Sequence, residues 1–264
     1  MGTATGQSSA GSLLDRIVAQ KEREIKALQP TRPSRPDRPF RFEQSLKRPP
    51  GQALRVIAEC KKASPSMGLI RSDYHPDRVA AAYRDCGASA LSVLTDREFF
   101  QGDLEHLRQA ARASGLPVLR KDFTISPLQI QEARAAGADA ILLIVRLLSR
   151  GQLTELHRAA RELGMTALVE IHNAAEAEDA IACGASLIGI NHRDLDTLEM
   201  DLSLTERIAP ELRRARPDAV LLAESGVENR VGRERVEPFV DGILIGTALM
   251  QSPDIPAKWA EIFA

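Results

Sequence analysis

The sequence predicts an α/β fold, a (β/α)8 barrel with an N-terminal helical extension. From Arg55 onward, eight short apolar runs alternate with longer amphipathic segments, and many of these segments end at a glycine. Strands that alternate with helices form a parallel sheet covered by helices, and eight such units fit a closed barrel. An open, doubly wound sheet is the alternative, but the GxGxxG motif of its dinucleotide-binding form does not follow the first strand.

Each expected strand is a short apolar run: residues 56–60, 90–94, 117–123, 139–145, 166–171, 186–191, 219–224 and 241–246. Glycines suited to a left-handed helix cap end the segments between them, at Gly87, Gly115, Gly137, Gly164 and Gly184. The cap reads DCGAS, AAGAD and ACGAS before the second, fourth and sixth strands. This repeat of about 50 residues indicates a body built from paired strand-helix units.

The helical extension is expected over residues 12–50, before the barrel at residues 51–264. Ser12 with Asp15 three residues later is typical of a helix start. Helical spacing continues through a set of mostly apolar residues: Leu14, Ile17, Val18, Lys21, Ile25 and Leu28.

Two other segments of the N-terminal region have simpler interpretations. Residues 1–11 predict a short disordered tail, because they lack the basic start and apolar core of a signal peptide. Residues 30–39 carry a proline at every third position, which predicts an extended linker with arginines along a solvated edge. A PxxP ligand for a partner domain is the alternative.

Composition excludes several classes of protein. The 36 acidic and 35 basic side chains give a net charge of -1, which argues against binding to nucleic acid or to a membrane surface. No apolar run is long enough to span a membrane. The three cysteines lack CxxC spacing and the histidines lack HExxH spacing, so we expect a cytoplasmic protein without a metal site. The HRD at residues 192–194 stands without the other kinase motifs, which favours an ordinary loop.

Polar side chains follow the predicted strands where these end: Glu59, Lys61, Lys121, Glu170, Asn191, Arg193 and Glu224. Each one alone is most simply a solvated strand end or half of an ion pair. The carboxyl ends of barrel strands meet at one mouth, however, and desolvating so many ions there costs several kcal/mol each. Their coincidence predicts a functional site.

The last two strands end in glycines. Backbone N–H groups of Gly226 and Val227, and of Gly246 and Thr247, are expected to converge on one anion. A phosphate site after strands seven and eight recurs in such barrels, so the sequence predicts a sugar phosphate as substrate.

Seven segments resemble the signature segments of the indole-3-glycerol-phosphate synthase family: residues 58–68, 94–107, 119–130, 168–173, 188–202, 223–227 and 243–250. The family is a (β/α)8 barrel with an N-terminal helical extension, to which the Ser12 helix and the segment with Phe40, Phe42 and Leu46 would belong. One departure is Met67 after Ser64-Pro65-Ser66, where many relatives carry a lysine.

The resemblance implies conversion of 1-(2-carboxyphenylamino)-1-deoxyribulose 5-phosphate to indole-3-glycerol phosphate, with release of carbon dioxide and water and without a cofactor. Ring closure puts negative charge on the ketone oxygen, so an acid is required, and dehydration needs an acid and a base. By resemblance Lys121 is the general acid and Glu170 the general base. A lysine acts as an acid near neutral pH when its pKa is lowered, and we expect burial or the cations Lys61 and Arg193 to lower that of Lys121.

The resemblance also implies roles for the remaining residues. Lys61 contacts the substrate carboxylate and phosphate and in some descriptions shares the acid role, whereas Glu59 and Asn191 hold substrate hydroxyls or orient the lysines. The implied substrate-binding residues are Ser64, Phe123, Arg193, Glu224 and Ser225, and the implied phosphate-binding residues are Lys61, Gly226, Gly246 and Thr247.

Two rival interpretations remain open. One is another phosphate-binding barrel, such as an isomerase or an aldolase that forms a Schiff base on Lys121 or Lys61. The other is a catalytically silent barrel that serves as a binding or scaffold protein. We expect a monomer, with a weak homodimer as the alternative.

Overall fold

The structure, a computed structural model, describes residues 12–195 and 197–264. The tail expected over residues 1–11 lies outside the described residues.

Eight parallel strands close into a barrel in the order β1-β10-β9-β8-β7-β6-β5-β4, which confirms the predicted fold class. The strands are β1 (Arg55–Cys60), β4 (Ala90–Leu94), β5 (Val118–Lys121), β6 (Ala140–Ile144), β7 (Thr166–Ile171), β8 (Leu187–Asn191), β9 (Val220–Glu224) and β10 (Gly242–Ile245). They agree with the predicted runs except that the third ends early, at Lys121, because Asp122 and Phe123 turn out of the sheet. A two-stranded antiparallel ribbon, β2 (Ala63–Ser64) with β3 (Gly68–Leu69), follows β1.

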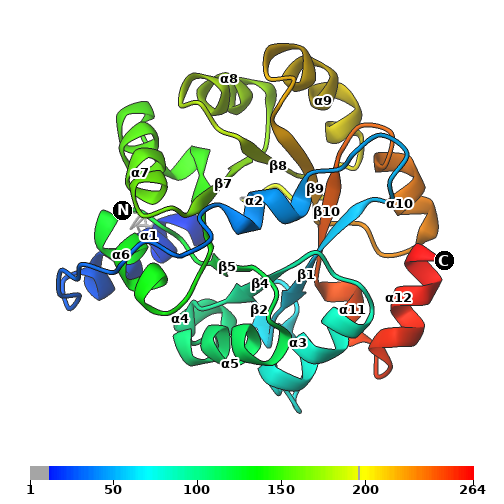
Figure 1. The fold of residues 1–264 in the computed structure, drawn as a ribbon, viewed down its shortest axis with the longest axis horizontal. Helices are drawn as coiled ribbons and strands as arrows, with labels where there is room; N and C mark the ends of the chain where they lie inside the picture. Colours follow the sequence, from blue (N-terminus) through cyan, green and yellow to red (C-terminus); the bar gives the residue numbers. More distant parts are fainter. Residues whose placement is uncertain (1–11, 196) are drawn as a thin grey trace, which may run out of the picture.

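Helices surround the barrel in a ring (Figure 1). They are α3 (Pro76–Asp85), α4 (Arg97–Phe100), α5 (Leu104–Ser114), α6 (Pro127–Ala135), η1 (Val145–Leu147), α7 (Arg150–Glu162), α8 (Ala174–Ala182), α9 (Ser203–Ala215), α10 (Arg230–Val236), α11 (Thr247–Gln251) and α12 (Ile255–Phe263). The five glycines expected at helix ends all have positive φ, which confirms their role as caps.

Side chains alternate along each strand between two apolar cores. In β1, Val56, Ala58 and Cys60 pack in the core under the helices, whereas Ile57 packs in the core inside the barrel. Glu59 shares the inner face with Ile57 and lines the cavity at the barrel mouth, because side chains two residues apart point the same way.

The N-terminal extension contacts both ends of the barrel. Helix α1 (Leu13–Ile25) begins with the predicted capping box, in which Ser12 Oγ accepts from Asp15 N and Asp15 accepts from Ser12 N. Helix α2 (Arg41–Leu46) lies across the barrel at the amino ends of the strands (Figure 1). Phe42 and Leu46 are fully buried there and close the inner core.

Residues 28–39 connect these two helices along the barrel wall. Thr31 N donates to Gln131 Oε1 of α6 at 2.9 Å, and the Arg134 guanidinium donates to Ser34 O at 3.1 Å. Phe40 N donates to Gly164 O at 2.9 Å, just before β7. The arginines of this segment are exposed, as expected, and its use as a PxxP ligand stays a prediction.

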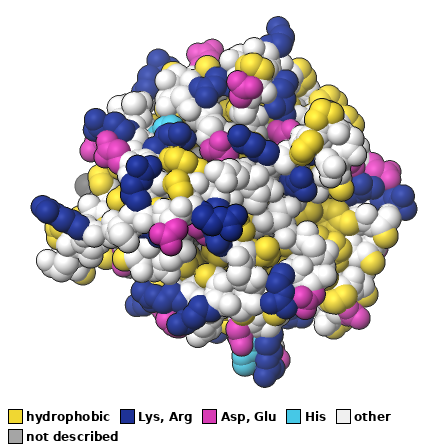
Figure 2. Space-filling model, viewed as in Figure 1, with side chains coloured by type: hydrophobic (Ala, Val, Ile, Leu, Met, Phe, Trp, Pro, Cys, Tyr) yellow, Lys and Arg dark blue, Asp and Glu magenta, His cyan; other side chains and the backbone are white. Residues whose placement is uncertain are grey.

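The face in Figure 2 carries basic and acidic side chains interspersed, in keeping with the balanced charge of the chain. Within the described residues, no helix has the length and apolar character needed to cross a membrane.

Candidate active site

A cavity opens at the carboxyl ends of the barrel strands. Every predicted site residue lines it: Glu59, Lys61, Ser64, Lys121, Phe123, Glu170, Asn191, Arg193, Glu224, Ser225, Gly226, Gly246 and Thr247. The residues come from six of the eight strands or the loops after them, so barrel closure rather than sequence proximity brings them together.

Lys121 lies at the centre of the charged group. Its Nζ is 2.8 Å from Glu170 Oε2 and 3.1 Å from Glu224 Oε2, so one ammonium joins the ends of β5, β7 and β9. The Lys121 side chain is 14% exposed, while both carboxylates are buried. A substrate that enters the cavity can therefore reach Lys121 before it reaches either glutamate.

The expected lowering of the Lys121 pKa is wrong. Burial does act to lower the pKa of Lys121, but the charges of Glu170, Glu224 and Glu59 outweigh it and raise the pKa above its ordinary value. The sequence placed these carboxylates at the same mouth but could not show that Glu170 and Glu224 contact Lys121 directly. Lys121 is thus a fully charged donor at neutral pH.

The two glutamates that share Lys121 differ in protonation. Burial alone would raise the pKa of Glu170, but Lys121 and His172 hold it well below its usual range. Burial and the nearby charge of Glu170 raise the pKa of Glu224 to about 8, against the pull of Lys121. Glu224 Oε1 accepts no hydrogen bond from any described residue. Glu170 is therefore the charged member of the pair at neutral pH.

Lys61 forms a second ion pair nearer the anion loops. Its Nζ is 2.6 Å from Glu59 Oε1 and donates to Thr247 Oγ1 at 3.1 Å. A Cβ on Gly246 would lie 2.5 Å from Glu59 Oε1, so only glycine leaves room for this pair. Lys61 thus joins the first strand to the segment predicted to bind phosphate.

The backbone after β9 turns sharply toward the cavity. Ser225 (φ 66°) and Gly226 (φ 77°) are both left-handed, a conformation that costs a non-glycine residue about 1 kcal/mol or more. His192 stabilises the turn, because its Nδ1 lies 2.9 Å from Ser225 O and its Nε2 2.7 Å from Thr205 Oγ1. Gly226 and Thr247 both line the cavity, and their role in binding phosphate stays a prediction.

Sequence reasoning named only Phe123 of the apolar wall of the cavity and missed the rest. Leu13, Leu14 and Ile17 of α1 line it, together with Phe100 and Phe123, whose ring centroids are 6.1 Å apart. The apolar spacing of α1 predicted a buried face but could not say that this face covers the mouth.

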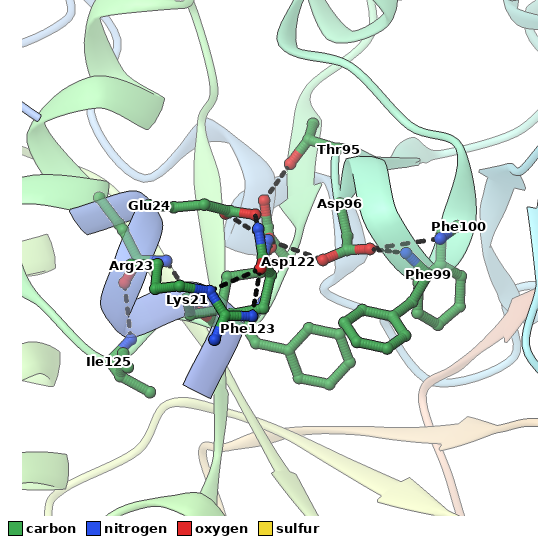
Figure 3. A network of polar contacts seen from close by, with 12 residues as sticks. Lys21, Arg23, Glu24, Thr95, Asp96, Phe99, Phe100, Asp122, Phe123 and Ile125 are labelled. Atoms are coloured by element: carbon green, nitrogen blue, oxygen red, sulfur yellow. Dashed lines mark hydrogen bonds and ion pairs between the residues drawn. The ribbon is translucent and has the colours of Figure 1, made fainter. Parts of the chain in front are cut away.

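A buried charge cluster that the sequence also missed holds α1 in place (Figure 3). Lys21 is only 1% exposed, and its Nζ is 2.7 Å from Asp96 Oδ2 and 2.8 Å from Asp122 Oδ1. Asp122 follows Lys121 directly, and Asp96 accepts hydrogen bonds from Phe99 N and Phe100 N. The sequence did carry a signal of this buried charge, because Lys21 occupies an otherwise apolar position of the helical pattern.

Comparisons with known proteins agree with this geometry. The family model described as indole-3-glycerol phosphate synthase matches residues 14–262. The chain belongs to the indole-3-glycerol phosphate synthase family.

Relatives that bear this name are similar over most of their length. The protein from Leptospira interrogans is 43% identical, over 95% of this chain and 97% of the relative. The one from Desulfotalea psychrophila is 46% identical, over 95% of this chain and 98% of the relative.

Solved structures with low sequence identity support the fold alone. The thiamine phosphate pyrophosphorylase from Pyrococcus furiosus has a TM-score of 0.58 at 17% identity, over 79% of this chain and 93% of that structure. The N-acetylmannosamine-6-phosphate 2-epimerase from Clostridium perfringens also has a TM-score of 0.58, at 13% identity, over 74% of this chain and 86% of that structure.

Proposed function

We propose that this member of the family is a carbon-carbon lyase of tryptophan biosynthesis that makes indole-3-glycerol phosphate from 1-(2-carboxyphenylamino)-1-deoxyribulose 5-phosphate. The observation that carries the proposal is the placement of Lys121 between Glu170 and Glu224, 2.8 and 3.1 Å away, at the centre of the cavity. An acid and a base in contact with each other, here from β5 and β7, are what ring closure followed by dehydration requires.

The cavity offers a suitable partner for each part of this substrate. The glycines after β9 and β10 line the region proposed to hold the phosphate, with Lys61 beside them. The apolar wall from α1, Phe100 and Phe123 suits the aromatic ring. Lys61 and Arg193 supply positive charge for the carboxylate before it leaves, and Ser64 and Asn191 are placed to hold hydroxyl groups.

Ring closure begins when the aromatic carbon that bears the carboxylate attacks the ketone carbon. The ketone oxygen gains negative charge and takes a proton from Lys121, and loss of carbon dioxide restores the aromatic ring. The hydroxyl then takes a proton from Lys61 and leaves as water, while Glu170 accepts a proton from the methylene carbon beside the nitrogen, which completes the indole. The chemistry needs no redox cofactor, since the bonds broken supply their own electrons.

The raised pKa of Lys121 is compatible with the acid role. An alkoxide is a strong base, so even a lysine of high pKa can transfer a proton to it as the new carbon-carbon bond forms. Lys121 is fully protonated before the substrate binds, which keeps the acid loaded at neutral pH.

The test is indole formation from the carboxyphenylamino sugar phosphate, followed by absorbance. Lys121→Met is expected to lower kcat/KM by about 10²- to 10⁴-fold, the usual contribution of a general acid. Lys258→Met is the matched control, because Lys258 lies in α12, outside the described wall of the cavity, and its ammonium pairs with the exposed Glu261 at 2.7 Å.

Three outcomes would count against parts of the proposal. A folded wild-type protein that forms no indole contradicts the function. A Lys121→Met variant with the wild-type rate moves the acid role to Lys61. Substrate trapped on Lys121 or Lys61 by borohydride favours a Schiff-base aldolase instead.

Location and assembly belong to the same proposal. We propose a cytoplasmic enzyme with a small sugar phosphate as its partner, acting as a monomer. Sedimentation that gives twice the 28.8 kDa chain mass would favour the weak homodimer.

A further inference from the structure

The second oxygen of Glu170 has a partner outside the cavity. Oε2 faces Lys121, whereas Oε1 lies 3.3 Å from Nε2 of His172. The His172 side chain is 1% exposed, and the described wall of the cavity includes Glu170 but not His172. Any influence of His172 on a bound substrate therefore passes through Glu170.

The opposite edge of the imidazole ring is fixed by a second carboxylate. His172 Nδ1 lies 3.2 Å from Glu176 Oε2, and the same oxygen accepts from the backbone N of His172 at 2.7 Å. Asn173 Nδ2 donates to Glu176 Oε1 at 2.8 Å, and Arg146 of η1 is 3.3 Å from it. The first turn of α8 thus holds the ring in one orientation toward β7.

An imidazole between two carboxylates is expected to be charged. Burial acts to lower the pKa of His172, but contacts with Glu170 and Glu176 outweigh it and raise the pKa to about 9. The other charged groups that face this pair are Lys121 from β5, Glu224 from β9 and Arg146 from η1.

Catalysis would remove one of the two cations beside Glu170. When Lys121 gives its proton to the ketone oxygen, it becomes neutral and no longer balances the Glu170 charge. His172 is then the remaining cation within ion-pair distance of that carboxylate among the described residues. No described residue lies in hydrogen-bond geometry to Nε2, so the contact is an ion pair whose strength does not depend on close alignment.

We propose that His172 is a positioning residue that, as a buried imidazolium, keeps Glu170 ionised and in place while Lys121 transfers its proton. The inference rests on the proposed function, in which Glu170 is the base. It predicts that loss of the His172 charge impairs turnover and the titration of Glu170 rather than substrate binding.

The kinetic test compares His172→Gln, which keeps an N–H donor but removes the charge, with the wild type. We expect kcat to fall about 10- to 100-fold, as for other residues that orient a functional group, with KM changed less than about twofold. The acid limb of the pH profile of kcat is expected to move up by about 1 to 3 units, because a neighbouring cation lowers a carboxylate pKa by that amount.

His157→Gln is the matched control, because His157 is also buried but lies in α7, outside the described wall of the cavity. It should lose stability without a shift of the acid limb. An unshifted acid limb in His172→Gln, or a rise of KM with unchanged kcat, would overturn the proposal.

A second measurement needs neither turnover nor a substituted His172. Nitrogen NMR of the imidazole in the wild-type protein should show both ring nitrogens protonated at pH 7.5, and Glu170→Gln should lower the midpoint of that titration. A neutral ring at pH 7.5 would overturn the proposal even if indole forms. Absence of indole with a charged, Glu170-dependent ring would instead contradict only the proposed function.

Discussion

The two ends of the barrel are covered by the same N-terminal extension in opposite ways. At the amino ends of the strands, α2 inserts Phe42 and Leu46, which are fully buried among apolar side chains. At the carboxyl ends, α1 is held by Lys21, an ammonium buried between Asp96 and Asp122. The amino end is closed by apolar packing, whereas at the mouth a buried charge cluster adds to the apolar contacts of α1.

The two kinds of closure differ in their energetic cost. Apolar burial is the less costly way to close a barrel, because a buried ion pair must first overcome a desolvation penalty of several kcal/mol. At the mouth, however, the Lys21 ion pairs connect α1 to Asp122, which follows Lys121, and to Asp96, the N-cap of the helix α4 that carries Phe100. We infer that the contacts of α2 at the amino ends of the strands mainly stabilise the fold. The contacts of α1 at the mouth also fix the geometry of the cavity.

Lys21→Met should have the largest effect, because it leaves Asp96 and Asp122 without their shared cation. Loss of one partner of a buried pair costs about 3–5 kcal/mol of unfolding free energy. Displacement of Asp122 and α4 should also lower kcat/KM by about 10- to 100-fold, as expected when catalytic groups move by about 1 Å. Urea unfolding and indole assays measure the two effects.

Arg41→Met is the matched control at the other end. Arg41 Nε is 3.0 Å from Asp139 Oδ1, an ion pair that joins α2 to the start of β6 and is partly exposed. The variant should lose about 1 kcal/mol or less and keep its kcat/KM. Equal losses of activity in both variants would contradict the division between the two ends.

The strands, α1 and the polar residues at the mouth could be predicted from sequence, but the buried ion pairs could not. Periodicity located the strands and α1, since burial on one face leaves a regular pattern. The polar residues at the mouth were identified because each directly follows an apolar run. The Lys21 cluster was not identified, because its partners are 75 and 101 residues away along the chain and no local pattern joins them. The raised pKa of Lys121 was not predicted for a different reason: the sequence placed Glu170 and Glu224 at the same mouth but could not give their distances from the Lys121 ammonium.

Phe42→Ala tests the apolar end directly. Removal of a fully buried phenylalanine costs about 3–5 kcal/mol through lost burial and the cavity left behind. The indole rate of the folded protein should stay within about twofold of the wild type, because Phe42 packs at the end opposite the catalytic cavity. A large fall of kcat at a temperature where the variant is folded would show that the two ends are coupled.

A rise in pH should weaken the interactions that stabilise the mouth more than those at the amino ends of the strands. The His172 pKa of about 9 lies above the value of about 6.5 in an unfolded chain, so between these values the folded state binds more protons. Its stabilisation is complete below about pH 6.5 and is lost as the pH rises to about 9, by up to about 3 kcal/mol. Glu224, whose pKa is raised from 4.5 to about 8, also makes the fold less stable as the pH rises, but over the lower range between these two values.

The measurement is the free energy of unfolding at several pH values between 6 and 9. Phe42→Ala should lower the free energy of unfolding at every pH but keep the wild-type dependence on pH, since Phe42 and the apolar side chains around it do not titrate. His172→Gln should flatten the slope, and a wild-type slope in that variant would assign the alkaline loss to another group.

The smallest effect is expected at the first turn of α1. Ser12→Ala removes the hydroxyl that accepts from Asp15 N at 3.2 Å, and loss of an N-cap costs about 1 kcal/mol. Because Leu13 and Leu14 directly after the cap line the cavity, fraying of this turn should raise KM about two- to fivefold with little change of kcat. At the other end, Gln44→Ala removes an exposed hydrogen bond to Pro39 O and should leave KM unchanged. A rise of KM in Ser12→Ala alone would show that the first turn of α1 forms part of the substrate-binding wall. An equal rise of KM in Gln44→Ala would contradict this, because it would show that KM responds to a general loss of stability.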